Sequence, residues 1–147
     1  QEGRGNDEIR AAVHFIQQQT AMKVFPAASK SALAKARAAI QKIKSNPTKA
    51  GYDAAMDDGA RALTQVCSNL AKLMDNAQCP AKLRSSLIGL KAVSRELDEF
   101  GGGAKRTVPD GTQSAAILLL NKEFKRHVDA AEQFFPIVVE FLKKHKL

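Results

Sequence analysis

The histidines, the side chains best suited to acid–base chemistry near neutral pH, are scattered along the chain. His14, His127 and His145 lie far apart in the sequence. Only His127 falls at the margin of an apolar helical face, where a histidine is more often a structural residue at the edge of a core than a base or a ligand. The histidines therefore do not predict a catalytic site.

Two other patterns resemble functional motifs only in part. Asp53 and Asp57 are four residues apart with Asp58 beside them, and three carboxylates could in principle hold a cation. Acids in the first turn of a helix stabilise its dipole, which explains them more simply. The segment Gly101–Arg106 lacks the Gly-Lys-Ser/Thr of a phosphate loop and follows an expected helix rather than a strand. We therefore predict a protein that is not an enzyme and that has no metal site and no cofactor.

The two cysteines, Cys67 and Cys79, are twelve residues apart with no second pair and no histidine nearby. This spacing argues against zinc and predicts a single disulfide, with two buried thiols as the alternative. The sequence begins at Gln1 rather than Met, which suggests a trimmed chain or a mature form without its targeting peptide. Together these features predict a secreted or otherwise extracytoplasmic protein.

Positive charge is concentrated in the first third of the chain. The 44 positions between Glu8 and Asp53 hold eight basic residues and no acidic one, while the rest of the chain holds 23 − 8 = 15 basic and 15 acidic residues. The formal net charge of +8 therefore arises in this segment, and it predicts an anionic partner. Nucleic acid is an unlikely partner, because the segment has few aromatic or arginine side chains for stacking.

On a helical wheel, these basic residues form two stripes. The predicted anion-contacting residues are Lys30, Arg37 and Lys44 on one stripe, and Lys35 and Lys42 on a second stripe nearly opposite. Such a surface could dock on a polyanion or an anionic membrane, or it could simply keep the helix solvated.

Apolar residues recur at spacings of three and four along the whole chain, and nothing alternates as a strand would. The pattern predicts an all-α fold, a single domain over 1–147 with about five amphipathic helices. Pro26 should end the first helix, and Ser45-Asn46-Pro47 should end the basic second helix. Thr48 should cap the third helix, Pro80 should begin the fourth, and the fifth should start near Thr112 or Ser114.

The last helix is apolar on more than one face and contains Pro136, which should kink or break it near its middle. Such a helix is either the central member of the bundle, or the wall of a ligand cavity, or a surface for a partner or second subunit. We expect a cavity for a fatty acid or other lipid, lined by Leu120, Phe124, Val128, Phe135, Val138 and Leu142. The alternative function is docking of the basic third on an anionic polymer or membrane surface. No apolar run reaches the roughly 18 residues of a transmembrane span.

Overall fold

The protein is an all-α bundle, as the sequence predicts. The structure is a computed structural model that describes the backbone of residues 2–75, 80–102 and 108–144, and the side chains of 23–72, 74, 80–100 and 108–143. Its long helices are α1 (Glu2–Ser45), α2 (Lys49–Ala71), α3 (Ala81–Leu97) and α4 (Ser114–Lys144). A 3₁₀ turn, η1 (Lys72–Asp75), extends α2, and a π-type turn, η2 (Asp98–Gly102), extends α3.

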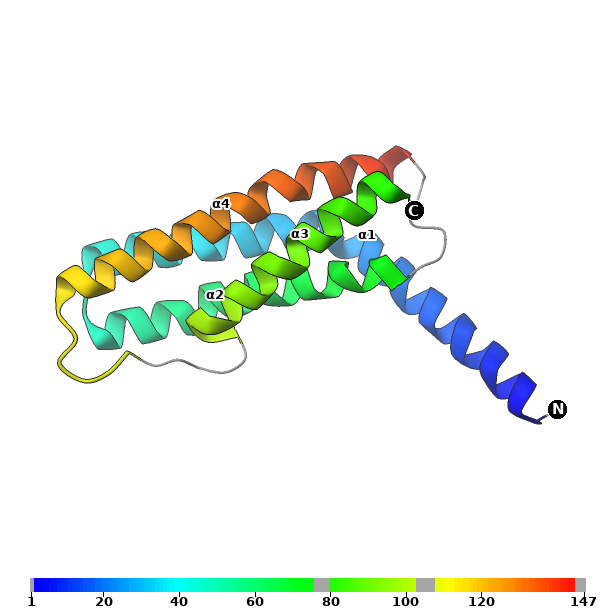
Figure 1. The fold of residues 1–147 in the computed structure, drawn as a ribbon, viewed down its shortest axis with the longest axis horizontal. Coiled ribbons are helices and arrows are strands. Elements are labelled where there is room, and N and C mark those ends of the chain that lie inside the picture. The colour runs from blue at the N-terminus through cyan, green and yellow to red at the C-terminus, as the bar shows by residue number, and fades with distance from the viewer. Residues whose placement is uncertain (1, 76–79, 103–107, 145–147) are drawn as a thin grey trace.

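Successive helices run in opposite directions and pack side by side (Figure 1). The main helix contacts are α1 with α2, α2 with α3, α3 with α4, and α4 with α1, so the four helices form a ring around one core. The N-terminal part of α1 extends beyond the end of the bundle (Figure 1). None of the described helices is long and apolar enough to cross a membrane.

The apolar periodicity correctly identifies the buried faces of the helices. On α3 the apolar residues that recur at spacings of three and four from Leu83 to Leu97 are buried, and the buried Phe100 in η2 continues this stripe. At the start of α2, the Thr48 hydroxyl accepts a hydrogen bond from the Gly51 N–H at 3.1 Å, which is the predicted cap. The buried stripe of α3 packs against α2 and α4, and the cap fixes where α2 begins beside the end of α1.

The described residues form four long helices rather than the predicted five, because α1 continues through Pro26. The prediction was wrong at this point for a structural reason. Pro26 is exposed, so the carbonyl that loses its N–H partner can face water. The preceding Phe25 is buried, and its ring meets that of Phe135 edge-on, with 5.6 Å between centroids. This contact holds α1 against α4 just before the proline. Just after it, Ser29 Oγ donates a 3.0 Å hydrogen bond to the Pro26 carbonyl.

Pro136 likewise fails to interrupt its helix. α4 runs unbroken from Ser114 to Lys144, and Pro136 lies in its last third rather than near its middle. Pro136 is exposed while Phe135 points into the core, so the proline again occupies the solvent side. The predicted kink at Pro136 is therefore not supported.

The described residues show no disulfide at Cys67. Cys67 is a free thiol buried in the core between the helices, and Cys79 lies outside the described residues. Cys67 lies on the inner stripe of α2, one turn from Leu63 and from Leu70, so its sulfur points into the core. Burial raises the pKa of the Cys67 thiol to about 12. The extracytoplasmic location rested in part on this bridge and stays a prediction.

Candidate functional site

Helix α1 forms a groove with each of its two neighbours. The groove between α1 and α4 has a volume of about 830 Å³ and lies where α1 ends and α4 begins. Its apolar lining comes from Ile40 on α1 and from Ala115, Leu118 and Leu119 on α4. Leu118 is 37% exposed and Leu119 is 66% exposed, so two adjacent leucines of the groove present apolar surface to solvent. We call this site the α1–α4 groove.

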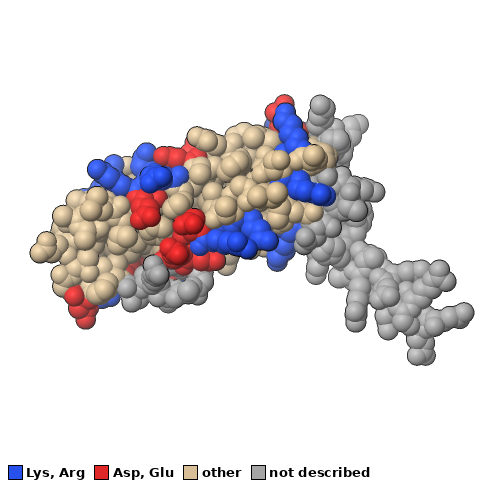
Figure 2. Space-filling view, in the orientation of Figure 1, with Lys and Arg blue, Asp and Glu red and all other residues tan. Residues whose placement is uncertain are grey.

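Basic side chains surround the apolar lining of the α1–α4 groove. Its cations are Lys44, Lys122, Lys125 and Arg126, and its acid is Asp129. Figure 2 shows lysine and arginine atoms over the first half of α4, next to a broad uncharged surface at that end of the bundle. The α1–α4 groove therefore combines apolar and cationic side chains in its lining.

The acid of this groove is already neutralised by neighbouring cations. Asp129 accepts from Arg37 at 2.7 Å and from Lys125 at 3.1 Å, and Arg37 also pairs with Glu132. The hydrogen bond from Arg37 lowers the pKa of Asp129 below its ordinary value, although burial opposes the shift. Among the described residues, Lys44, Lys122 and Arg126 form no ion pair. These three cations are therefore available to an anion.

One buried polar side chain lies in the wall of the α1–α4 groove. Asn121 donates from Nδ2 to the carbonyl of Ile40 at 3.1 Å, so it ties α4 to α1. Its Oδ1 is buried and has no hydrogen-bond partner among the described residues. A buried acceptor without a hydrogen-bond partner costs on the order of 1–3 kcal/mol of folding free energy, so the Asn121 Oδ1 destabilises the folded protein.

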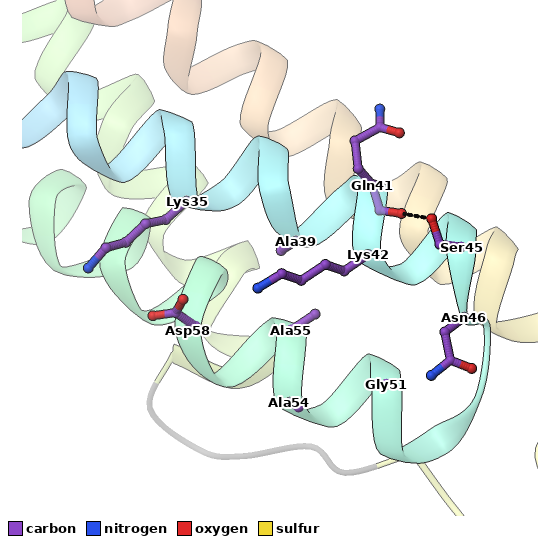
Figure 3. Close-up of a pocket in the computed structure, with 10 residues that line it drawn as sticks. All are labelled: Lys35, Ala39, Gln41, Lys42, Ser45, Asn46, Gly51, Ala54, Ala55 and Asp58. Carbon is purple, nitrogen blue, oxygen red and sulfur yellow. Dashed lines mark hydrogen bonds between the residues drawn. The ribbon is translucent and has the colours of Figure 1, made fainter.

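The second groove lies between α1 and α2 and is smaller and more polar, at about 490 Å³. Figure 3 shows Lys42 projecting from α1 between Ala39 and Ala55, Lys35 extending from α1 away from these two alanines, and Asp58 on α2. The rest of its lining is Gln41, Ser45, Asn46, Gly51 and Ala54. No side chain that lines it is both apolar and larger than alanine. We call this site the α1–α2 groove.

Close packing of the two helix backbones explains the small residues of the α1–α2 groove. A Cβ atom on Gly59 would lie 2.7 Å from the Cβ of Ala39 and 3.1 Å from the carbonyl oxygen of Lys35. Only glycine lets α2 approach α1 this closely. Gly59 therefore has a packing role between α1 and α2.

Three of the five predicted anion-contacting residues line one of the two grooves, and the other two line neither. Lys44 lines the α1–α4 groove, and Lys35 and Lys42 line the α1–α2 groove. Arg37 is bound by two carboxylates of α4, and Lys30 is exposed but lines neither groove. The two stripes are real, but they face different neighbours.

The residues predicted to line a lipid cavity lie in the core. Phe124, Val128, Phe135, Val138 and Leu142 are buried, and Leu120 packs partly buried against them. None of the six lines either of the two grooves. The residues that line the α1–α4 groove instead, among them Leu118, Leu119, Lys122 and Arg126, were not selected from the sequence. Leu118 and Leu119 belong to the apolar residues of the last helix that lie beyond one face. The basic residues that follow them, beginning one turn later at Lys122, are the sequence feature that could have indicated an amphipathic groove here.

The candidate catalytic and metal-binding groups have structural partners. The ring of His127 packs against that of Phe100 with 5.8 Å between centroids, and its Nε2 is buried without a hydrogen-bond partner in the described part of the chain. Asp53 pairs with Lys49 at 2.8 Å and Asp57 with Arg61 at 2.9 Å. Within the described residues, no group of three His, Cys, Asp or Glu side chains is arranged to hold a metal ion.

Comparison with known proteins adds no further constraint. No family model, no curated protein and no solved structure matches this chain. The function must therefore be inferred from the grooves themselves.

Proposed function

We propose that this protein is a non-enzymatic binding protein for an amphipathic ligand with an anionic head and an apolar chain, such as a fatty acid. The observation that carries the proposal is the α1–α4 groove, in which the exposed Leu118 and Leu119 are bordered by Lys44, Lys122 and Arg126. The volume of about 830 Å³ is in the range of small-molecule sites.

The chemistry of the groove suits the two parts of such a ligand. Covering the exposed faces of two leucines with an alkyl chain removes apolar surface from water, at roughly 25 cal/mol per Å². The unpaired cations attract a carboxylate or phosphate head, and Asp129 opposes it little because Arg37 and Lys125 already bind that acid. The proposal keeps the predicted ligand class and moves the ligand from the core to a surface groove.

A displacement titration tests the proposal. Palmitate, added below its micellar concentration, should displace the anionic dye anilinonaphthalene sulfonate in a saturable way. The double variant Leu118→Gln/Leu119→Gln should weaken palmitate binding at least about tenfold, because each leucine contributes on the order of 1 kcal/mol of apolar contact. Ile88→Gln is the matched control, since Ile88 is 56% exposed on α3 and does not line the groove.

A second pair of variants separates the head from the chain. Lys122→Gln/Arg126→Gln should weaken palmitate but leave binding of uncharged hexadecanol unchanged, because only the carboxylate uses these cations. The proposed function would be overturned if Ile88→Gln lost as much palmitate affinity as the leucine double variant. It would also be overturned if palmitate did not displace the dye from wild-type protein in a saturable way.

A further inference from the structure

We infer that the α1–α2 groove is a second, separate binding site, whose ligand is a small polyhydroxylated anion of the sugar phosphate class. The inference does not rest on the proposed function, because the two grooves share no lining residue.

Three charged side chains in the α1–α2 groove have no ionic partner. Lys35, Lys42 and Asp58 form no ion pair among the described residues, and Figure 3 shows them on the two sides of the groove. Charged residues close by behave differently, since Lys49 pairs with Asp53 and Arg61 pairs with Asp57. The α1–α2 groove therefore presents two cations and one anion toward the same space.

Their arrangement defines the polar half of a ligand. Lys35 and Lys42 are seven residues apart on α1, so their backbones are separated by roughly 10 Å along the helix. Two flexible ammonium groups at that spacing can converge on one phosphate from either side. Asp58 accepts hydrogen bonds only, so it suits the hydroxyl groups of the same molecule and repels a second anionic group.

The floor and the closed end of the groove define its shape. Ala39, Ala54 and Ala55 form a shallow apolar floor that fits the C–H face of a sugar ring but offers nothing to a long alkyl chain. Asn46 closes the end, where its side-chain nitrogen would be 3.0 Å from a Cβ on Gly51. Ser45 donates to the carbonyl of Gln41 at 3.0 Å, and the side chain of Gln41 points away from α2 in Figure 3. The volume of about 490 Å³ suits a molecule of sugar phosphate size.

Nuclear magnetic resonance titration of the whole chain tests the inference with three probes: glucose 6-phosphate, inorganic phosphate and glucose. We expect saturable shifts of the Ala39, Gly51, Ala54 and Ala55 amides with glucose 6-phosphate, with a dissociation constant of about 1 mM or lower. Inorganic phosphate should bind more weakly at the same amides, and glucose should cause no saturable shift. Shifts spread over all basic residues with no saturation would overturn the site.

Variants test each half of the recognition. Lys35→Gln/Lys42→Gln should weaken the binding of glucose 6-phosphate at least about tenfold and leave the displacement of the dye by palmitate unchanged. Lys23→Gln/Lys30→Gln is the matched control, because both lysines are exposed on α1 and line neither groove. A loss of the same size in this control would show a general charge effect and contradict the inference.

Asp58→Ala separates the hydroxyl contact from the phosphate contact. Removing the negative charge should strengthen binding of inorganic phosphate, whereas the preference for glucose 6-phosphate over phosphate should fall because the hydroxyl acceptor is gone. An unchanged preference would overturn the assignment of Asp58 and with it the sugar part of the ligand class.

Discussion

Helix α1 packs against α2 and against α4 in two different ways. Against α2 it uses small residues, and the Gly59 backbone approaches Ala39 so closely that even a methyl group would clash. Against α4 it uses large side chains, such as the Phe25 ring on Phe135, and a buried hydrogen bond from Asn121 to Ile40. The close seam leaves a shallow polar groove with lysines at its edge. The wider seam leaves a larger groove with exposed leucines, so the packing of one helix sets the chemistry of both sites.

Phe25→Ala should have the largest effect, because it removes the aromatic contact between α1 and α4 next to Pro26. Loss of a buried phenylalanine costs about 3–5 kcal/mol of unfolding free energy. Urea denaturation followed by circular dichroism measures the change. Val24→Ala is the control, since Val24 is the neighbouring residue and is 54% exposed. If the two variants lose the same stability, the wide seam does not depend on this ring pair.

Gly59→Val tests the close seam. The added side chain must push α1 and α2 apart, so we expect a loss of about 1–3 kcal/mol of stability. The same variant should abolish glucose 6-phosphate binding in the α1–α2 groove while palmitate binding in the α1–α4 groove persists. Ala38→Val adds an equally branched side chain at an exposed position of α1 and should change neither ligand affinity. Parallel loss of both ligands in Gly59→Val would mean that the two seams are not independent.

Asn121→Leu tests the buried amide in the wide seam. The substitution removes the hydrogen bond to Ile40 and also the buried Oδ1 that lacks a partner. Because a typical hydrogen bond contributes about 1 kcal/mol and an unpaired buried acceptor costs about as much or more, stability should be unchanged or rise by up to about 1 kcal/mol. Thermal unfolding checks this, and a loss above about 2 kcal/mol would show that the hydrogen bond is the dominant contribution.

Asp129→Asn should have the smallest effect on stability, because Asp129 and Arg37 are both partly exposed and such pairs contribute about 0–1 kcal/mol. The pKa of Asp129 is lowered in the folded protein, so its contribution is present above its ordinary pKa and is lost as the pH falls through the lowered value. Wild-type protein should therefore lose its small advantage over the variant below about pH 4. Denaturation at a series of pH values measures this difference, and an advantage that persists at low pH would contradict the ion-pair origin.

The sequence predicts the helices and their inner faces well, because burial of an apolar stripe depends mainly on the local 3.6-residue period. Leu83 to Phe100 and the α4 stripe show this agreement. The predicted helix end at Pro26 and the predicted kink or break at Pro136 were wrong, because the rule that proline ends a helix omits tertiary contacts such as that between Phe25 and Phe135. In this protein the helix continues through each proline, and the residue immediately before the proline packs in the core.

The sites were harder to predict than the helices. The sequence separates Lys35 and Lys42 from Lys44 on the wheel of α1, but it does not say which helix lies beside each stripe. Lys122 and Arg126 become relevant only once α4 is known to run beside the end of α1. A groove is a property of two helices that are distant in sequence, so the period of one helix cannot reveal it.

Cys67 gives the protein an internal reporter of its own opening. A thiol that is fully enclosed and that keeps its proton until about pH 12 is almost inert toward alkylating reagents while the bundle is closed. In a Cys79→Ser background, the rate at which a maleimide or a disulfide reagent modifies Cys67 would therefore measure how often α2 separates from its neighbours. Occupying either groove should lengthen the interval between these events, so a single buried sulfur would record ligand binding at both sites.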